Sequence, residues 1–368
     1  MDFICQGCAS IHPREYVTCV RSMGPLLVAS TTHDTLRLVS YDAETLAPVF
    51  PFPMDFHVQG HSAKAKITGL APSTETVLLT SFEDGMVAVF DIRAQGPVGT
   101  LMIGQRRDTQ CLATSSDSRG MVCAGDGKDI VIADMMARKV LTRNDSHHSD
   151  TVTALSWSPH KASMICSGGE DGLVNVTDLA DPHELHAVVS LNEPVARLAF
   201  SPSGVIYGHT TLENCFAVLA DSGEIVSKVD RRDESTYVAD VLLLGGDPFV
   251  VLGRHGEDFE SVCGNVECWT MSQSPYTHVA TLAGAHKDIV RSMTQIKGGG
   301  ADIMPYCRIA TGSEDGSLAV WRVAEVWKEV GGDTEEVAPL LQRVSGRSGP
   351  KETVAGGANR TKPYHKKR

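Results

Sequence analysis

The sequence predicts an all-β fold in which one short unit is repeated seven times around a ring. Apolar runs end at residues 42, 91, 134, 178, 221, 270 and 322, so the step between successive runs is 43 to 52 residues. Each unit contains short apolar runs of about four to seven residues that are bounded by Pro, Gly and Asp, which is typical of antiparallel strands. Three of the units also share one motif, a histidine followed at a regular distance by a Glu-Asp-Gly turn.

This motif places the units in a common register. The pairs are His61 and Asp84, His148 and Asp171, and His286 and Asp315. The spacing is 23 residues in the first two pairs and 29 in the third, where six extra residues lie near the glycines at 298–300. A loop insertion of this size changes the free energy of folding only slightly. A period of about 40–45 residues with a recurring histidine and a recurring Asp-Gly turn is typical of a β-propeller.

The repeats define the predicted domain boundaries. Residues 1–325 form one seven-bladed propeller, 326–342 a linker or an extra outer strand or helix, and 343–368 a tail. A lone four-stranded blade cannot bury both of its faces, so the blades must stack and the ring must close. We expect residues 3–10 to form a strand that pairs with the last blade and removes an open sheet edge. The alternative is a closing strand around residues 337–344.

The charge is distributed unevenly along the chain. The net charge is −12, but residues 343–368 carry eight basic residues and one acid, so the tail is +7 and the rest is −19. The tail is rich in Gly, Ser, Lys and Arg, which predicts disorder. A tyrosine among lysines permits base stacking beside phosphate contacts, so the tail is a candidate RNA-contact or import segment, and the alternative is a solubilising tail. Its candidate residues are Arg360, Lys362, Tyr364, Lys366, Lys367 and Arg368.

The period and the repeated motif resemble the WD-repeat family over roughly residues 3–325. The resemblance implies a hydrogen-bonded network of His, Ser or Thr, Asp and Trp within a blade, which ties a loop to the strands. All four positions are present in His286, Thr311, Asp315 and Trp321. Two other units have three of the four residues. One unit has His61, Thr80 and Asp84, with Phe90 in the place of Trp. The other has His148, Ser167 and Asp171, with Thr177 in that place. His147 lacks the repeat spacing, so we expect it to be the freer of the two adjacent histidines.

Acidic residues precede the turn glycines in three units. Glu83, Glu170 and Glu314 occupy equivalent positions, and equivalent turns of a propeller gather on one rim. The sequence therefore predicts an electronegative rim that would bind other proteins through basic peptide segments. The alternative is that these side chains are merely solvated.

Catalytic signatures are missing from the sequence. The stretch at residues 124–129 has neither the spacing nor the hydroxyl of a phosphate-binding loop, and there is no H-E-x-x-H or G-x-S-x-G motif. Cys5 and Cys8 have the spacing of half a zinc site without a second half. We therefore expect no enzyme activity, metal, cofactor, small-molecule substrate or membrane segment, and we predict a non-catalytic interaction scaffold.

Two settings for such a scaffold follow from resemblances. Residues 148–152, 171–176, 278–282 and 290–292 and the basic C-terminus resemble the WD repeat-containing protein 89 family, which implies a nuclear or nucleolar scaffold, with ribosome assembly as one setting. The alternative rests on Phe90-Asp91-Ile92-Arg93, which resembles the Trp-Asp-x-Arg box of substrate receptors of cullin ubiquitin ligases. Asp91 and Arg93 would then be the docking residues.

Overall fold

The structure is a computed structural model that describes most of the first of two compact units, which are Met1–Ala324 and Glu325–Arg368. The described residues are 3–11, 15–33, 37–51, 61–62, 65–94, 96–104, 109–115, 120–229, 236–244, 247–254, 263–272, 275–296 and 308–323. The predicted linker at 326–342, the predicted tail at 343–368 and the alternative closing strand at 337–344 lie outside these residues.

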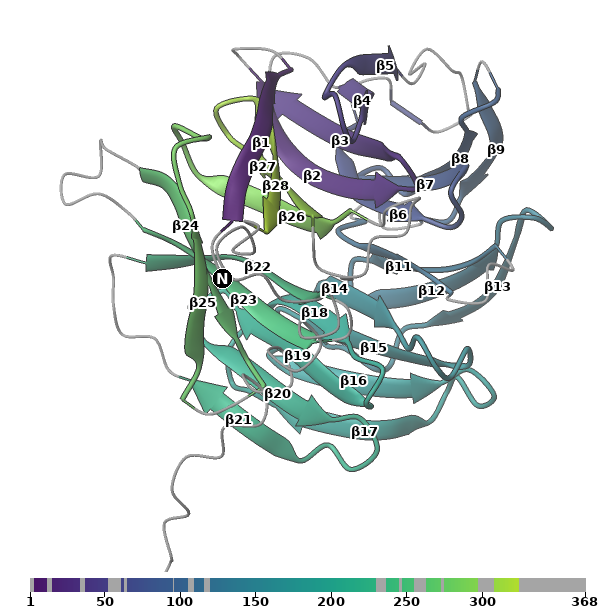
Figure 1. Ribbon diagram of the computed structural model, residues 1–368. Coiled ribbons are helices and arrows are strands. Elements are labelled where there is room, and N and C mark those ends of the chain that lie inside the picture. The colour runs from purple at the N-terminus through teal and green to yellow at the C-terminus, as the bar shows by residue number, and fades with distance from the viewer. Residues whose placement is uncertain are drawn as a thin grey trace, which may run out of the picture. The chain divides into compact units, whose positions relative to one another are not determined.

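Seven antiparallel four-stranded sheets follow one another around a common centre, which confirms the predicted seven-bladed β-propeller (Figure 1). Blade 1 consists of β2 (Glu15–Met23), β3 (Leu26–His33), β4 (Arg37–Asp42) and β5 (Pro48–Pro51). Blade 2 consists of β6 (Ile67–Pro72), β7 (Val77–Phe82), β8 (Met86–Asp91) and β9 (Pro97–Met102). Blade 3 consists of β10 (Leu112–Thr114), β11 (Met121–Asp126), β12 (Asp129–Asp134) and β13 (Lys139–Asn144).

The remaining blades repeat this order of strands. Blade 4 consists of β14 (Val152–Trp157), β15 (Met164–Gly169), β16 (Leu173–Asp178) and β17 (Leu185–Ser190). Blade 5 consists of β18 (Val195–Phe200), β19 (Val205–Thr210), β20 (Cys215–Leu219) and β21 (Ile225–Val229). Blade 6 consists of β22 (Thr236–Leu244), β23 (Asp247–Arg254), β24 (Cys263–Thr270) and β25 (Thr277–Leu282). Blade 7 consists of β26 (Val290–Gln295), β27 (Arg308–Ser313), β28 (Ser317–Val323) and β1 (Phe3–Ser10).

The hydrophobic core lies between neighbouring blades. Every residue of β15 is buried, because both faces of this strand are covered, whereas in the outermost strand β17 only alternate residues are buried. One apolar cluster joins Val174 and Val176 of blade 4 to Phe200 and Phe216 of blade 5. Sheets that pack face to face bury their apolar side chains in this way. The short apolar runs in the sequence therefore form strands because each blade provides the cover for the next one.

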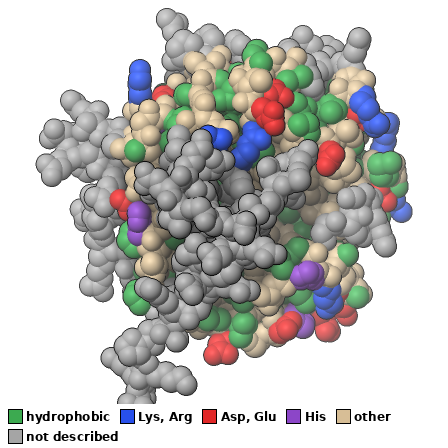
Figure 2. Space-filling view, viewed as in Figure 1, with side chains coloured by type: hydrophobic (Ala, Val, Ile, Leu, Met, Phe, Trp, Pro, Cys, Tyr) green, Lys and Arg blue, Asp and Glu red, His purple; other side chains and the backbone are tan. Residues whose placement is uncertain are grey.

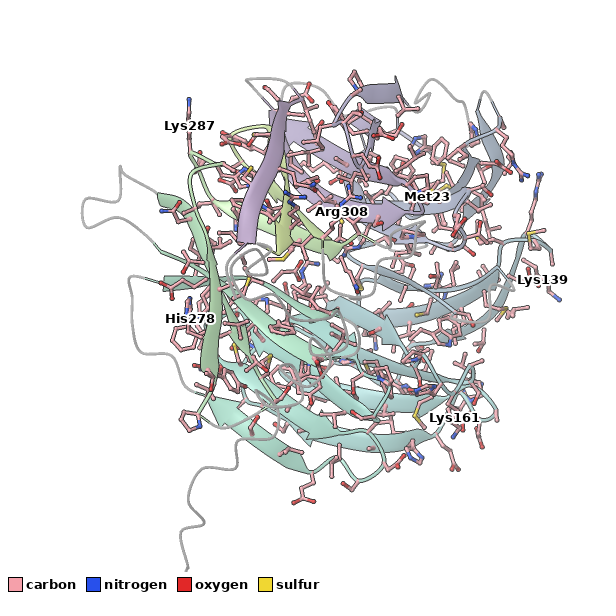
Figure 3. All side chains as sticks on the ribbon, in the orientation of Figure 1. Met23, Lys139, Lys161, His278, Lys287 and Arg308 are labelled. Carbon is pink, nitrogen blue, oxygen red and sulfur yellow. The ribbon has the colours of Figure 1, made fainter. Side chains whose placement is uncertain are left out.

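Residues 3–10 form β1, which pairs antiparallel with β28 from Phe3 opposite Val323 to Ser10 opposite Ser317. The strand order of blade 7 is β1, β28, β27 and β26, so β28 has a partner on each side. Arg308 of β27 also donates a hydrogen bond to the carbonyl of Ala43 in blade 1 (Figure 3). The first and last parts of the ring are thus joined by a sheet and by a side chain.

The Asp-Gly turns explain part of the repeated motif. Gly85, Gly172 and Gly316 have positive φ angles of 91°, 74° and 76°, which side chains with a Cβ adopt at a cost. At Gly85 a Cβ would also lie 2.4 Å from Cα of Gly104, which is closer than real contacts permit. Glycine is therefore required where the second strand of a blade turns into the third.

A second repeated feature lies in the innermost strands. In six blades the pairing of the innermost strand shifts register by one residue near its start, as a β-bulge does. The residue after the bulge then lies beside the centre of the ring. These residues are Cys19, Gly69, Ala154, Arg197, Asp240 and Ser292.

Candidate functional site

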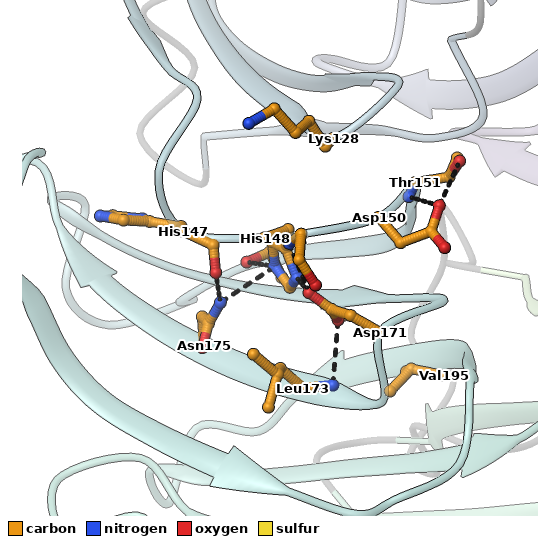
Figure 4. A network of polar contacts seen from close by, with 12 residues as sticks. Lys128, His147, His148, Asp150, Thr151, Asp171, Leu173, Asn175 and Val195 are labelled. Atoms are coloured by element: carbon orange, nitrogen blue, oxygen red, sulfur yellow. Dashed lines mark hydrogen bonds and ion pairs between the residues drawn. The ribbon is translucent and has the colours of Figure 1, made fainter.

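The clearest polar network lies in blade 4 and centres on the buried ring of His148 (Figure 4). Its Nδ1 lies 3.1 Å from both carboxylate oxygens of Asp171, and its Nε2 lies 2.8 Å from Oγ of Ser167. Because a carboxylate only accepts, Nδ1 carries the proton and Nε2 accepts the serine hydroxyl. Asp171 also accepts the backbone N–H groups of Ser149 at 2.9 Å and Leu173 at 3.1 Å. The network therefore ties the loop that enters blade 4 to its second and third strands.

His147 belongs to the same blade and has ring contacts of its own, contrary to the expectation that it is the freer of the two adjacent histidines. It is 5% exposed, and its Nε2 accepts from Nδ2 of Asn144 at 2.8 Å. Its Nδ1 lies 3.3 Å from Oγ1 of Thr177, and its carbonyl accepts from Nδ2 of Asn175 at 2.6 Å. Thr177 stands where the family pattern has Trp. The contacts of His147 with Asn175 and Thr177 take the place of the hydrogen bond that an indole N–H would donate in this blade. Asn175 and Thr177 are polar residues inside the otherwise apolar third strand, and this feature of the sequence could have indicated a buried polar partner.

Blade 2 contains a shorter version of the network. Nδ1 of His61 lies 2.8 Å from Oδ2 of Asp84, which also accepts the N–H of Ser62 at 2.7 Å. Oγ1 of Thr80 is buried and has no hydrogen-bond partner among the described residues. Phe90, 1% exposed, fills the position of Trp and provides no N–H group. The histidine and the aspartate are therefore brought together, whereas the link to the threonine is not made.

Blade 7 contains all four predicted residues, but a fifth one connects them. Nε1 of Trp321 donates to Oγ1 of Thr311 at 2.8 Å, and that hydroxyl lies 2.6 Å from Nε2 of His286. On its other side, Nδ1 of His286 lies 2.8 Å from Oγ of Ser317, which donates to Asp315. The direct separation between His286 Nδ1 and Asp315 Oδ1 is 3.9 Å. Ser317 therefore bridges the imidazole and the carboxylate in this blade.

The protonation states suit a structural role. Burial lowers the pKa of His148, so its ring is neutral near pH 7. Burial raises the pKa of Asp171, but the hydrogen bonds that its carboxylate accepts from Ser149, Leu173 and the His148 ring outweigh this effect and keep that pKa below its usual range. An ionised carboxylate beside a neutral imidazole satisfies the buried polar groups of the loop.

Another buried histidine predicts a pH dependence of stability. His209 of β19 is 6% exposed, and its pKa is lowered to about 4, first by burial and then by the nearby charge of Arg197. An unfolded histidine has a pKa of about 6.5. Because the folded-state pKa is depressed, the stabilisation is complete above pH 6.5 and is lost as the pH falls towards 4. The difference corresponds to about 3 kcal/mol in the free energy of unfolding.

We therefore expect the free energy of unfolding of His209→Gln to fall less than that of the wild type as the pH is lowered from about 6.5 to about 4. Urea unfolding at pH 7, 5.5 and 4.5 measures the effect, and His160→Gln, at an exposed position, is the matched control. An equally steep loss of stability in His209→Gln and the wild type would contradict this assignment.

The three predicted rim glutamates occupy equivalent turns between the second and third strands of their blades. Each backbone N–H donates to the carbonyl of a residue that precedes the innermost strand, at 2.8–2.9 Å. Their side chains differ. Glu314 pairs with Nε of Arg291 at 2.5 Å, the carboxylate of Glu83 accepts the N–H of Lys66 at 3.1 Å, and the exposed carboxylate of Glu170 makes no hydrogen bond to another described residue. The structure therefore leaves only one of these three carboxylates unengaged.

Two further acids lie in the loop that leads into blade 4, in which the carbonyl of Thr151 accepts the backbone N–H of Glu170. Asp145 and Asp150 are exposed in the loop that the His148 network holds, and Asp150 accepts the N–H of Thr151 at 2.7 Å. Lys128 lies on the same side, where its Nζ donates to the backbone carbonyl of Asp145 at 2.9 Å (Figure 4). We call Asp145, Asp150 and Glu170 the blade 4 acidic cluster. Elsewhere acidic and basic side chains of the described residues are interspersed over the viewed face (Figure 2).

Asp91 is the last residue of β8, the third strand of blade 2, and Arg93 follows it, at the end of the propeller opposite the Asp-Gly turns. Nε of Arg93 donates to Oδ1 of Asp91 at 2.8 Å and Nη2 donates to Oδ2 at 2.5 Å. The side-chain hydrogen bonds from Arg93 lower the pKa of Asp91 to about 2. The two charged groups predicted for ligase docking therefore satisfy each other within one turn, although the Arg93 side chain remains 71% exposed.

Among the described residues, no cluster of three or more His, Cys, Asp or Glu side chains is arranged to hold a metal ion. Cys5 and Cys8 lie on β1, where Sγ of Cys5 contacts the carbonyl of Gly7 and Sγ of Cys8 that of Ala285. The same part of the chain contains no helix with the length and apolarity required to span a membrane.

Comparisons with known proteins agree with this geometry. Residues 139–178 match the family model of the WD domain, G-beta repeat, and this range runs from the start of β13 to the end of β16. The sequence repeat thus consists of the outermost strand of one blade and the first three strands of the next. This offset explains why the motif connects a loop between two blades to the strands of the second one.

Relatives of known sequence and structure resemble longer stretches of the chain. WD repeat-containing protein GTS1 of Arabidopsis thaliana is 24% identical over 277 residues, which are 69% of this chain and 68% of that protein. Methylosome protein WDR77 of Xenopus laevis is 28% identical over 172 residues, which are 45% of this chain and 51% of that protein.

Among solved structures, a chain in the crystal structure of the mitotic checkpoint complex superimposes with a TM-score of 0.67 at 16% identity. The match covers 87% of this chain and 91% of that one. At this identity the likeness shows the fold alone. Together, these matches show that one repeat and the fold of this protein are similar to those of WD-repeat β-propellers.

Proposed function

We propose that this protein is a non-catalytic scaffold that binds basic peptide segments of other proteins on the face that carries the Asp-Gly turns. The blade 4 acidic cluster carries the proposal. Its three carboxylates are exposed, and the buried contacts of His148 and Asp171 hold the loop and the turn on which they lie. A rigid, negatively charged surface attracts Lys- and Arg-rich segments and pays little conformational entropy on binding them.

The resemblance to the WD repeat-containing protein 89 family supports a nuclear or nucleolar setting, with ribosome assembly as one example. A basic segment of a ribosomal protein, an assembly factor or a histone has the chemistry that the acidic cluster would bind. The basic tail at 343–368 would then contact RNA or direct import. Removal of residues 345–368 should weaken salt-sensitive RNA association or nuclear localisation and leave thermal stability nearly unchanged. If both properties persist, the tail only increases solubility.

The acidic cluster can be tested by charge removal without loss of shape. We expect the triple variant Asp145→Asn, Asp150→Asn and Glu170→Gln to weaken binding of a fluorescent Lys/Arg-rich peptide about tenfold or more at low salt. Fluorescence anisotropy at increasing salt measures the effect. The amide at position 150 retains the acceptor for Thr151, so the loop should stay folded. Unchanged affinity in the triple variant would refute the proposed binding face.

The double variant Asp91→Ala and Arg93→Ala is the matched control, because its charges lie on the opposite end of the propeller. It should leave peptide affinity unchanged. The same variant tests the cullin-ligase alternative, whose support is weaker because Asp91 and Arg93 pair with each other. Loss of ligase co-purification in this variant alone would favour the receptor function over the scaffold.

A further inference from the structure

The centre of the propeller contains an arginine that breaks the pattern of its repeat. The innermost strands β2, β6, β14, β18, β22 and β26 surround the centre (Figure 1). At the position after the bulge, five of these six strands carry a short side chain, whereas β18 carries Arg197. Cross-strand from Arg197 is His209, which burial keeps uncharged, so blade 5 provides no carboxylate at this point.

Two of the short residues at this position, Ser292 and Asp240, bind the next blade through a side-chain acceptor, and Arg197 cannot do so. Oγ of Ser292 accepts the N–H of Val20 at 3.1 Å, and Oδ2 of Asp240 accepts the N–H of Met293 at 3.1 Å. An arginine has no acceptor atom. The equivalent N–H in blade 6, that of Val241, donates to Oδ1 of Asp240 instead, at 2.9 Å. The guanidinium of Arg197 is thus excluded from the packing between the blades.

Arg197 is exposed to the channel and has no hydrogen-bond or ion-pair partner among the described residues. It lines a cavity of about 140 Å³ together with Arg21. Arg21 belongs to β2 of blade 1, and blades 6 and 7 lie between blade 1 and blade 5 in the ring. Nη1 of Arg21 donates to the carbonyl of Val20 at 2.8 Å and to Oγ of Ser292 at 3.3 Å. A guanidinium has five N–H donors, so most of the donors of both arginines remain available.

The described carboxylate in this cavity does not neutralise the arginines by direct contact. Asp240 lines the cavity, but its two oxygens accept the backbone N–H groups of Val241 and Met293. Neither arginine forms an ion pair with it within 4.0 Å. Among the described residues that line the cavity, two are cations and one is an anion, which gives this part of the channel a net positive charge inside a protein that is acidic as a whole.

We propose that the channel binds one phosphoryl group between Arg21 and Arg197. A phosphoryl group has a charge between about −1.5 and −2 and three terminal oxygens, so it can engage two guanidinium groups, whereas one bidentate arginine already satisfies a carboxylate. The cavity is large enough for one such group and too small for a nucleotide, since ligand pockets of drug-sized molecules are about 300–1,000 Å³. The source is either free inorganic phosphate or a phosphorylated side chain that enters the channel.

Calorimetric titration of the full chain distinguishes these sources. Inorganic phosphate is one probe, and a phosphoserine peptide with its unphosphorylated counterpart is the other, all at constant chloride. Binding of inorganic phosphate identifies the free anion as sufficient. Binding of the phosphopeptide alone identifies a phosphorylated segment as the ligand. Absence of heat and of a thermal shift with both probes would overturn the proposal.

Variants locate the bound group. Arg197→Gln and Arg21→Gln should each weaken binding about tenfold or more, and Arg138→Gln, at an exposed position on the outer part of blade 3, should have no effect. Arg197→Gln should melt at nearly the wild-type temperature, because Arg197 is not packed between blades. Full affinity in Arg197→Gln would place the binding elsewhere, for example on the basic tail, and would refute the channel site. The triple variant of the blade 4 acidic cluster should bind phosphate normally, so the two proposals fail independently.

Discussion

Replacing Arg143 with leucine should lower the free energy of unfolding by about 3–5 kcal/mol, because it removes the guanidinium that pairs with two buried carboxylates. Arg143 lies on β13 of blade 3. Its Nη1 donates to Oδ2 of Asp126 at 2.7 Å and to Oδ2 of Asp129 at 3.0 Å, and its Nη2 donates to the carbonyl of Ile103. Asp126 is 0% exposed and Asp129 is 3% exposed, so water cannot replace the guanidinium.

Urea unfolding at pH 7, followed by circular dichroism, measures this effect. Lys139→Leu is the matched control, since it removes an exposed cation from the same strand and should change stability by less than about 0.5 kcal/mol. Adding Asp126→Asn and Asp129→Asn to Arg143→Leu should restore part of the stability, because the two carboxylates that lost the guanidinium are then neutral amides. A loss below about 1 kcal/mol in Arg143→Leu would show that the ion cluster does not hold blade 3 together.

Deleting residues 1–11 should have the other large effect, because it opens the ring. Without β1, the edge of β28 from Ser317 to Val323 loses its partner and exposes unpaired N–H and C=O groups beside the buried Trp321. We expect the free energy of unfolding to fall by an amount on the order of 5 kcal/mol, which is comparable to the total stability of many domains. An unpaired edge also recruits other strands, so the truncated chain should self-associate.

Thermal melting and light scattering after size-exclusion chromatography measure stability and association. Deletion of residues 345–368 is the control and should leave both unchanged. Adding a synthetic peptide of residues 1–11 to the truncated chain should restore part of the melting temperature. A monomeric truncated chain that melts like the full one would show that β1 does not close the ring.

Much of the fold could be predicted from the sequence because the signals are local and repeated. The period of the apolar runs and the Glu-Asp-Gly turns depend on short stretches, and each turn needs glycine for its positive φ. The spacing between His148 and Asp171 likewise reflects one loop and two strands of a single blade. Seven blades and the pairing of residues 3–10 with the last of them follow from the need to cover every sheet face and edge.

The details of the candidate sites required the tertiary structure. Ser317 between His286 and Asp315, and His147 with Asn175 in blade 4, arise from side-chain distances that no spacing predicts. Arg143, which bridges Asp126 and Asp129, looks like an ordinary surface cation in the sequence. Arg197 and Arg21 are 176 positions apart and share a cavity only because the ring closes. Strand order and turns are local properties of the chain, whereas the charge that a buried group meets depends on which blades become neighbours.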